Sequence, residues 1–250
     1  MSSSRVLEAE KVTFRYGRKI ALDKVSFGLG VGATVLLGRN GAGKTTLIST
    51  LVGAAPPADG RVCLDGRVIG GGSRQGRKAL REVGWLPQSF GFPPHMTVEE
   101  FVGYAGWLKE VPRARLASRV SETIALVGLE HKTKHPLRTL SGGQLRRAGL
   151  AAAVVAEPGV LVLDEPTAGL DPEQREEFHE LVRALRTHTV VLVATHLLED
   201  VEALAQRIIV LDGGRLRWSG TPQALAALAG AEPGLQGLRR GFQVALESVG

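Results

Sequence analysis

The chain carries a glycine-rich segment, GRNGAGKT, whose residue types and spacing suit the binding of phosphate groups. It matches the pattern G-x-x-x-x-G-K-[ST], in which glycines let the backbone N–H groups wrap closely around phosphate oxygens. In that pattern Lys44 reaches the β- and γ-phosphates, and the Thr45 hydroxyl can ligate Mg²⁺. An apolar run precedes the segment and a helical run follows it, so a helix N-terminus adds partial positive charge. We therefore predict a nucleoside-triphosphate site. Its residues are Gly38, Arg39, Asn40, Gly41, Ala42, Gly43, Lys44, Thr45 and Thr46.

Two acidic residues follow a second apolar run, residues 160–163. A buried strand end is a rigid mount for a carboxylate, and Asp164 is placed there to hold Mg²⁺ directly or through water. Glu165 would point toward the γ-phosphate, where it can polarise the attacking water as a general base. Alone, the pair could be an ordinary acidic loop after a strand. The phosphate-binding segment upstream favours the chemical interpretation.

A third segment, LSGGQ, opens another helical run. A Ser-Gly-Gly turn at a helix N-terminus offers exposed amides, one hydroxyl and the helix dipole, so it can bind an anion. For an isolated segment of this kind, simple N-capping by Ser141 without a ligand is the favoured interpretation.

The three segments in this order resemble the ATP-binding cassette (ABC) ATPases, a family whose signature is LSGGQ. The resemblance covers about residues 5–220. It implies that ATP and Mg²⁺ are the cofactors, with Thr45, Gln88 and Asp164 around the metal. It also adds the signature residues to the nucleotide site: Ser141, Gly142, Gly143 and Gln144.

Four further residues match the family, although each has a structural alternative when taken alone. Tyr16 resembles the aromatic residue that stacks on adenine, and Gln88 resembles the glutamine that senses Mg²⁺ and the γ-phosphate. His196 resembles the switch histidine that contacts the γ-phosphate, and Asp171 lies in a segment similar to the D-loop. The resemblance thus implies a catalytic set of Gln88, Glu165 and His196. Because Glu165 and His196 are both present, we expect a site that hydrolyses ATP.

In the ABC family two cassettes pack head to tail with two ATP molecules between them. The resemblance implies that Ser141 and Gly143 contact the γ-phosphate held by Lys44 of the other cassette, and that Asp171 links the two sites. Each chain carries two anion-binding helix starts, so phosphate charge stays exposed until a second cassette closes on it. We expect a homodimer, because both half-sites are intact.

Short β-rich runs alternate with longer helical ones, which predicts an α/β domain. The resemblance refines this to a P-loop NTPase (RecA-like) core with an antiparallel β subdomain and an inserted helical subdomain at about 90–150. Continuous apolar runs at 34–37, 160–163 and 190–194 are typical of central parallel strands buried on both faces. The expected strands are 6–9, 34–37, 62–64, 83–86, 160–164, 189–195 and 208–211.

The ATPase domain is expected at 5–220, followed by a short C-terminal extension, 221–250. Two glycine-rich stretches, 70–76 and 230–237, are interpreted as loops. The residues from Ala231 onward carry little pattern, so we assign them no role.

The composition is that of an ordinary globular chain, with 44% hydrophobic and 22% charged residues among 250. It argues against disordered, fibrous and disulfide-rich classes, and the formal net charge of +6 is too small to indicate a polyanion partner. No apolar run reaches the length of about 20 residues needed to cross a bilayer, and no secretory signal precedes the domain. We expect a cytoplasmic protein that is peripheral on the inner face of the cell membrane.

The leading interpretation is the energising subunit of a membrane transporter whose integral membrane subunit is another chain. Residues 88–102 and 167–172 look most like cassettes of bacterial export systems, and an importer is the close alternative. We expect residues 90–96 to help form the groove that receives the membrane subunit. A soluble ABC ATPase acting on ribosomes or DNA is a weaker alternative, because the chain has one cassette and no room for a long coiled coil between Gln88 and Ser141. No nucleic-acid partner is expected.

Overall fold

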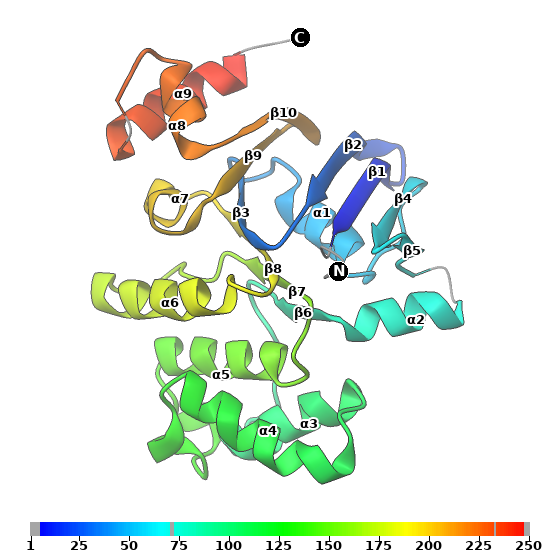
Figure 1. Ribbon diagram of the computed structural model, residues 1–250, viewed down its shortest axis with the longest axis vertical. Helices are drawn as coiled ribbons and strands as arrows, with labels where there is room; N and C mark the ends of the chain where they lie inside the picture. Colours follow the sequence, from blue (N-terminus) through cyan, green and yellow to red (C-terminus); the bar gives the residue numbers. More distant parts are fainter. Residues whose placement is uncertain (1–5, 71–72, 233, 248–250) are drawn as a thin grey trace.

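The computed structural model describes residues 6–70, 73–232 and 234–247, and it confirms the α/β class. Its largest sheet contains the strands β3 (Gly32–Leu37), β6 (Val83–Leu86), β7 (Val160–Asp164), β8 (Val190–Thr195), β9 (Arg207–Asp212) and β10 (Arg215–Gly220). Over the described ranges the strand order is β10-β9-β3-β8-β7-β6 (Figure 1). Neighbours from β9 to β6 pair in parallel, and β10 is antiparallel at the edge. The strongly apolar runs therefore became central parallel strands, as expected.

A smaller antiparallel sheet lies beside this core. It contains β1 (Leu7–Tyr16), β2 (Lys19–Leu29), β4 (Asp59–Leu64) and β5 (Arg67–Val68), in the order β2-β1-β4-β5. The pattern had predicted only short pieces of β1 and β4, and none of β2, β5 and β10. Strand β5 has only two residues, and β2 and β10 alternate apolar with polar or charged residues, which is typical of strands with one solvated face.

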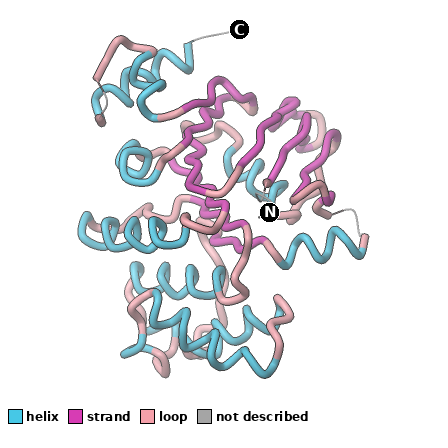
Figure 2. Tube along the Cα trace, in the orientation of Figure 1, coloured by secondary structure: helices cyan, strands magenta, loops and turns pink. Residues whose placement is uncertain are grey.

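Helices cover the parallel sheet and form a separate group at one end of the molecule. Those around the core are α1 (Lys44–Leu51), α2 (Arg74–Arg81), α6 (Pro172–Leu185) and α7 (Leu198–Leu204). The separate group holds α3 (Val98–Leu108), α4 (Arg113–Leu126) and α5 (Gly142–Val154), with short 3₁₀ turns at Glu130–Lys132 and Leu137–Thr139. Figure 2 shows helices and loops in this group, whereas the strands gather in the rest of the molecule. None of the described helices has both the length and the apolar character needed to cross a bilayer.

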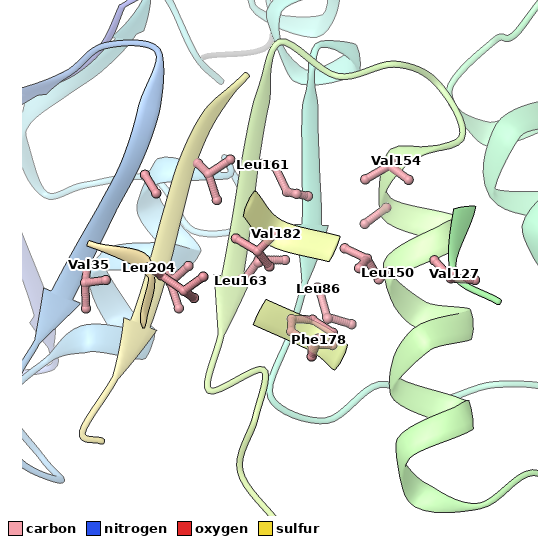
Figure 3. Close-up of a cluster of buried hydrophobic side chains, with 14 of the residues drawn as sticks. Val35, Leu86, Val127, Leu150, Val154, Leu161, Leu163, Phe178, Val182 and Leu204 are labelled. Carbon is pink, nitrogen blue, oxygen red and sulfur yellow. The ribbon is translucent and has the colours of Figure 1, made fainter. Parts of the chain in front are cut away.

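The buried side chains form two clusters, one on each face of the parallel sheet. Successive residues of β7 alternate between them: Leu161 and Leu163 belong to one cluster, and Val160 and Val162 to the other. Figure 3 shows Leu161 and Leu163 near Val182 and Phe178 of α6. Because both faces of β7 are covered, the strand is apolar throughout and its carboxyl end is held rigidly. That end is Asp164.

The C-terminal residues correct an expectation, since they form helices where we predicted little pattern. The chain continues through α8 (Pro222–Ala227) into α9 (Leu235–Glu247), which packs on α8, α7, β9 and β10. The buried face of α9 contains Gly237, Leu238, Gly241 and Ala245. Three of these four residues are small, so the apolar periodicity that identifies a helix in a sequence is weak here.

The two predicted glycine-rich loops are also shorter than expected. Helix α2 begins at Arg74, with the Ser73 hydroxyl accepting from Gly76 N, and α9 begins at Leu235. Residues 71, 72 and 233 of these stretches lie outside the described part of the chain.

Close backbone packing of α9 on α8 gives a testable expectation. A Cβ on Gly241 would lie 1.9 Å from the carbonyl oxygen of Leu225, whereas a Cβ on Gly103 of α3 would meet nothing nearer than 3.8 Å. Gly241→Ala should lower the free energy of unfolding by about 1–3 kcal/mol through overpacking. The control Gly103→Ala should raise it by about 0.5–1 kcal/mol, because alanine is the better helix former. Urea denaturation measures both, and an undiminished stability of Gly241→Ala would show that α9 is not docked this way.

Candidate functional site

A cavity of about 610 Å³ lies at the carboxyl end of β3, and most of the predicted site residues meet there. It is bounded by the phosphate-binding segment, the end of β1, the start of β2 and the segments after β6, β7 and β8. The predicted residues among its lining are Tyr16, Arg39, Asn40, Gly41, Gly43, Lys44, Thr45, Thr46, Gln88, Glu165 and His196.

The phosphate-binding segment connects β3 to α1 and points the start of this helix at the cavity. Gly43, immediately before the helix, has a φ of +103°, a conformation that L side chains rarely adopt. Lys44 is 6% exposed, and its Nζ donates to the carbonyl of Gly38 at 2.8 Å. Gly38 and Ala42 do not line the cavity; a Cβ on Gly38 would lie 2.5 Å from the carbonyl of Leu211, so this glycine is needed for packing.

Glu165 lies at the centre of the polar groups in the cavity. Its Oε1 is 3.2 Å from Lys44 Nζ, and its Oε2 is 2.9 Å from Nδ1 of His196. The residue has a φ of +47°, which is unusual for a side chain other than glycine. Its backbone N–H donates to the carbonyl of Ala194 at the end of β8. This bond fixes the turn that directs the carboxylate toward Lys44 and His196.

Asp164 is buried directly behind this group. Burial raises the pKa of Asp164, and a hydrogen bond from the Thr45 hydroxyl opposes that rise only in part. Its Oδ1 has no hydrogen-bond partner among the described residues. A buried carboxylate with a free oxygen beside a hydroxyl is a set of hard donors that suits a divalent cation. Thr45 and Gln88 line the cavity, whereas Asp164 does not.

The walls of the cavity include residues that the sequence analysis missed: Lys19, Ile20, Ala21, Gly213 and Gly214. The tandem glycines form the turn between β9 and β10, where both have positive φ, the signature of a tight hairpin turn. The N–H of Gly214 donates to the carbonyl of Ala42, so this turn supports the phosphate-binding segment. The Gly-Gly pair after the predicted strand 208–211 was the sequence signal from which this turn could have been predicted.

Tyr16 stands at the open edge of the cavity. Its ring is 61% exposed and packs edge-on against Phe14 at a centroid distance of 5.1 Å. Its hydroxyl is 3.4 Å from that of Thr46. An exposed aromatic ring above the phosphate-binding segment is available to stack on a planar base.

The segment before Gln88 and the helix α5 are joined by a residue that we did not predict. Arg146 donates from its guanidinium to the carbonyls of Pro87 at 3.0 Å and Gln88 at 2.9 Å. It therefore ties the backbone of the Gln88 segment to the helix that begins after Ser141.

The signature residues and Asp171 do not line this cavity. Ser141 forms a reciprocal capping box with Gln144: the Ser141 hydroxyl accepts from Gln144 N, and the Gln144 side chain accepts from Ser141 N. Ser141 and Gly142 are exposed at the start of α5, and Gly143 is buried beside the side chain of Gln174. Asp171 is exposed and caps α6 by accepting from Gln174 N. Within one chain, Ser141, Gln144 and Asp171 therefore take part in helix capping.

Comparison with known proteins identifies the family. The family described as "ABC transporter" matches residues 22–168, which include the phosphate-binding segment, LSGGQ and Glu165. The chain is 34% identical to a linearmycin resistance ATP-binding protein of Bacillus subtilis, over 98% of this chain and 79% of that protein. It is 38% identical to a Nod factor export ATP-binding protein of Paraburkholderia xenovorans, over 88% and 72% of the two chains.

Two further similarities concern the direction of transport and the formation of dimers. The chain is 33% identical to an Fe(3+) ions import ATP-binding protein of Escherichia coli, over 90% of this chain and 64% of that protein. A solved structure described as the dimeric MJ0796, a bacterial ABC transporter cassette, superposes with a TM-score of 0.78 and is 25% identical, covering 86% of this chain and 98% of that one.

The motifs, the convergence of most predicted site residues on one cavity and these similarities lead to a single conclusion: the chain belongs to the ABC transporter family, as an ATP-binding subunit that hydrolyses ATP to drive transport.

Proposed function

We propose that ATP binds in the cavity at the carboxyl end of β3 and is hydrolysed there with Glu165 as the general base. The observation that carries this proposal is the cluster of Lys44, Glu165 and His196, in which one buried carboxylate contacts both a cation and an imidazole. The phosphate-binding segment, residues 38–46, supplies inward backbone N–H groups for the phosphates. Tyr16 stacks on adenine from the open edge.

Thr45, Asp164 and Gln88 are the residues that would hold Mg²⁺. The orphaned buried Oδ1 of Asp164 supports this assignment, because such an oxygen calls for a positively charged partner. When bound, the metal neutralises charge on the β- and γ-phosphates. Lys44 adds a second positive charge on the same side.

In hydrolysis, Glu165 accepts a proton from the water that attacks the γ-phosphorus. His196 orients this carboxylate through the contact at Oε2 and contacts the γ-phosphate with its other ring nitrogen. The φ of +47° at Glu165 holds the base in a fixed direction before ATP arrives. Gln88 senses the γ-phosphate and transmits its presence to the helical group.

A second copy of the chain completes each site. Ser141, Gly142, Gly143 and Gln144 are absent from the cavity of their own chain, although the start of α5 is suited to an anion. We propose that these residues close on the γ-phosphate held by the other copy, with Asp171 at the contact between the copies. The dimeric state of the related cassette supports this arrangement. ATP then holds the dimer together, and hydrolysis releases it.

The helical group is proposed to receive the integral membrane subunit. An apolar groove of about 270 Å³ lies between the Gln88 segment, α3 and α5, with Trp85, Phe90, Phe101 and Leu108 in its lining. Phe90 and Phe101 stack at a centroid distance of 5.9 Å, so the segment after Gln88 contributes directly to this groove. From the expected stretch 90–96, only residues 90 and 91 line it.

We propose an exporter, acting at the inner face of the cell membrane. The linearmycin resistance and Nod factor export proteins support this direction, while the iron import protein keeps import as the alternative. The ATPase domain is proposed to span 5–220, with the helical subdomain at about 90–150 and the extension at 221–250. No nucleic-acid partner is part of the proposal.

Removing the proposed base should separate ATP binding from hydrolysis. Glu165→Gln keeps the shape of the side chain but cannot accept the proton, so kcat should fall by at least about a hundredfold. ATP affinity should stay close to that of the parent, and ATP should trap a dimer in size-exclusion chromatography. The exposed Glu180→Gln on α6 is the control and should behave as the parent. Normal turnover of Glu165→Gln would contradict the base assignment, and a strictly monomeric ATP complex would contradict the shared site.

Lys44→Ala should weaken the binding of ATP. The variant lacks the ammonium that meets the phosphates, so its affinity for a fluorescent ATP analogue should fall by about tenfold or more. Unchanged affinity would contradict the role of Lys44 in holding phosphate.

The ionised carboxylate of Asp164 should lower the stability of the ligand-free protein, although Mg²⁺-dependent hydrolysis needs it. Because burial raises its pKa, the folded protein holds the ionised form less favourably than the unfolded chain does at neutral pH. Asp164→Asn should therefore raise Tm in the absence of Mg²⁺ and ATP, yet require more Mg²⁺ for half-maximal hydrolysis. The exposed Asp59→Asn should change neither. An unaltered Mg²⁺ requirement in Asp164→Asn would remove this residue from the metal site.

A further inference from the structure

A fully buried carboxylate lies close to the segments of Glu165 and His196, the proposed catalytic pair, and belongs to none of the nucleotide-binding motifs. Asp200 is in the first turn of α7 and is 0% exposed. Its partners come from three different places in the chain: Thr167 after β7, His179 in α6 and Thr195 at the end of β8. All three partners are themselves buried.

Within the described part of the chain, the hydrogen bonds of this carboxylate are 2.7–2.9 Å long. The Thr167 hydroxyl lies 2.9 Å from Oδ1 and 2.7 Å from Oδ2, and the Thr195 hydroxyl donates to Oδ2 at 2.7 Å. Nε2 of His179 donates to Oδ1 at 2.8 Å. Burial alone would raise the pKa of Asp200, but the bonds from His179, Thr167 and Thr195 outweigh it and lower the pKa. Asp200 is therefore an ionised acceptor held by three donors.

The two threonines lie beside the catalytic groups in the chain. Thr195 directly precedes His196, and its hydroxyl oxygen also accepts the N–H of Leu197 on the other side of that histidine. Thr167 lies two residues after Glu165, in the segment that leads to Asp171. One carboxylate thus connects the segment that carries Glu165 to the segment that carries His196.

Structural stability alone does not explain a polar network at this position. A buried charged group pays a large desolvation cost, and apolar side chains of similar volume often stabilise a fold as well or better. What directional hydrogen bonds add is a fixed geometry between the elements that they join. Here the joined elements end in Glu165 and His196, whose contact is 2.9 Å.

We propose that Asp200 is a positioning residue for ATP hydrolysis: with Thr167, Thr195 and His179 it holds the Glu165 segment and the His196 segment in register. The inference rests on the proposed roles of Glu165 and His196. Because the Thr167 segment continues to Asp171, the same network connects the proposed contact with a second copy to the catalytic pair. None of its four members lines the ATP cavity, so the network acts on the hydrolysis step and leaves ATP binding unchanged.

The test removes one hydroxyl at a time with little change in shape. Thr167→Val and Thr195→Val should each lower kcat by about tenfold to a hundredfold, because a small misplacement of catalytic groups is costly. The KM for ATP and the affinity for a fluorescent ATP analogue should stay within about threefold of the parent. Thr167→Ser and Thr195→Ser keep the hydroxyl and should restore most of kcat.

Thr123→Val is the matched control. Thr123 is as buried as the network threonines, and its hydroxyl donates to the carbonyls of Arg119 and Val120, within the helical group. It should lose stability as the network variants do while keeping kcat. If Thr167→Val and Thr195→Val likewise lower only Tm, the network is structural and the proposal is wrong. The two variants act from different segments, so either one carries the test if the other fails to fold.

A double-mutant cycle tests the positioning role of the Asp200 network separately from the base assignment of Glu165. In a Glu165→Gln background, Thr195→Val should lower the residual rate no further, since its effect acts through Glu165 and His196. An independent, multiplicative loss would overturn the positioning role. Normal turnover of Glu165→Gln itself would overturn the base assignment. If Thr167→Val and Thr195→Val keep the parental kcat while Glu165→Gln is inactive, the positioning role is wrong and the base assignment stands.

Discussion

The ionic contact between Lys44 and Glu165 is the interaction on which the site depends. Both side chains are 6% exposed and their charged atoms are 3.2 Å apart, so each compensates a charge that would be costly to bury alone. The contact exists because β3 and β7 flank β8 in one parallel sheet, so that their carboxyl ends open on the same edge. A phosphate-binding segment after one strand and a carboxylate after the other then share one cavity. His196, after the strand between them, completes the cluster.

The LSGGQ segment lies outside the cavity that contains Lys44 and Glu165. Helix α5, in the helical group, begins within LSGGQ at Gly142, and Ser141 and Gln144 cap it reciprocally. In the proposed dimer, this helix start meets the γ-phosphate held by the second copy. The bond from Arg146 to the Gln88 segment joins this helix to the edge of the cavity. Arg146 is thus a direct link between the helical group and a segment that lines the cavity.

Support for the site comes from elements late in the chain. The turn at Gly213 and Gly214 bonds to Ala42 in the phosphate-binding segment, and α7 carries Asp200, which accepts from Thr195 beside His196. Helix α9 packs on α7 and on α8, so the C-terminal extension covers the helix that holds this carboxylate. A region to which the pattern assigned no role thus packs against the helix that contains Asp200.

What the sequence by itself determined is the local chemistry: residues 38–46, Asp164, Glu165 and the apolar strands that mount them. These features are contiguous in the chain, and local spacing is enough to specify a loop before a helix or a carboxylate after a buried strand. Three features were established only by the tertiary structure. They are the cavity-lining positions of Ile20 and Gly214, the helix α9 with its small buried residues, and the partners of Asp200. Each depends on contacts between segments far apart in the chain. A Gly-Gly pair after a strand indicates a turn, but neither a glycine nor a hydroxyl identifies from the sequence the distant group that it will meet.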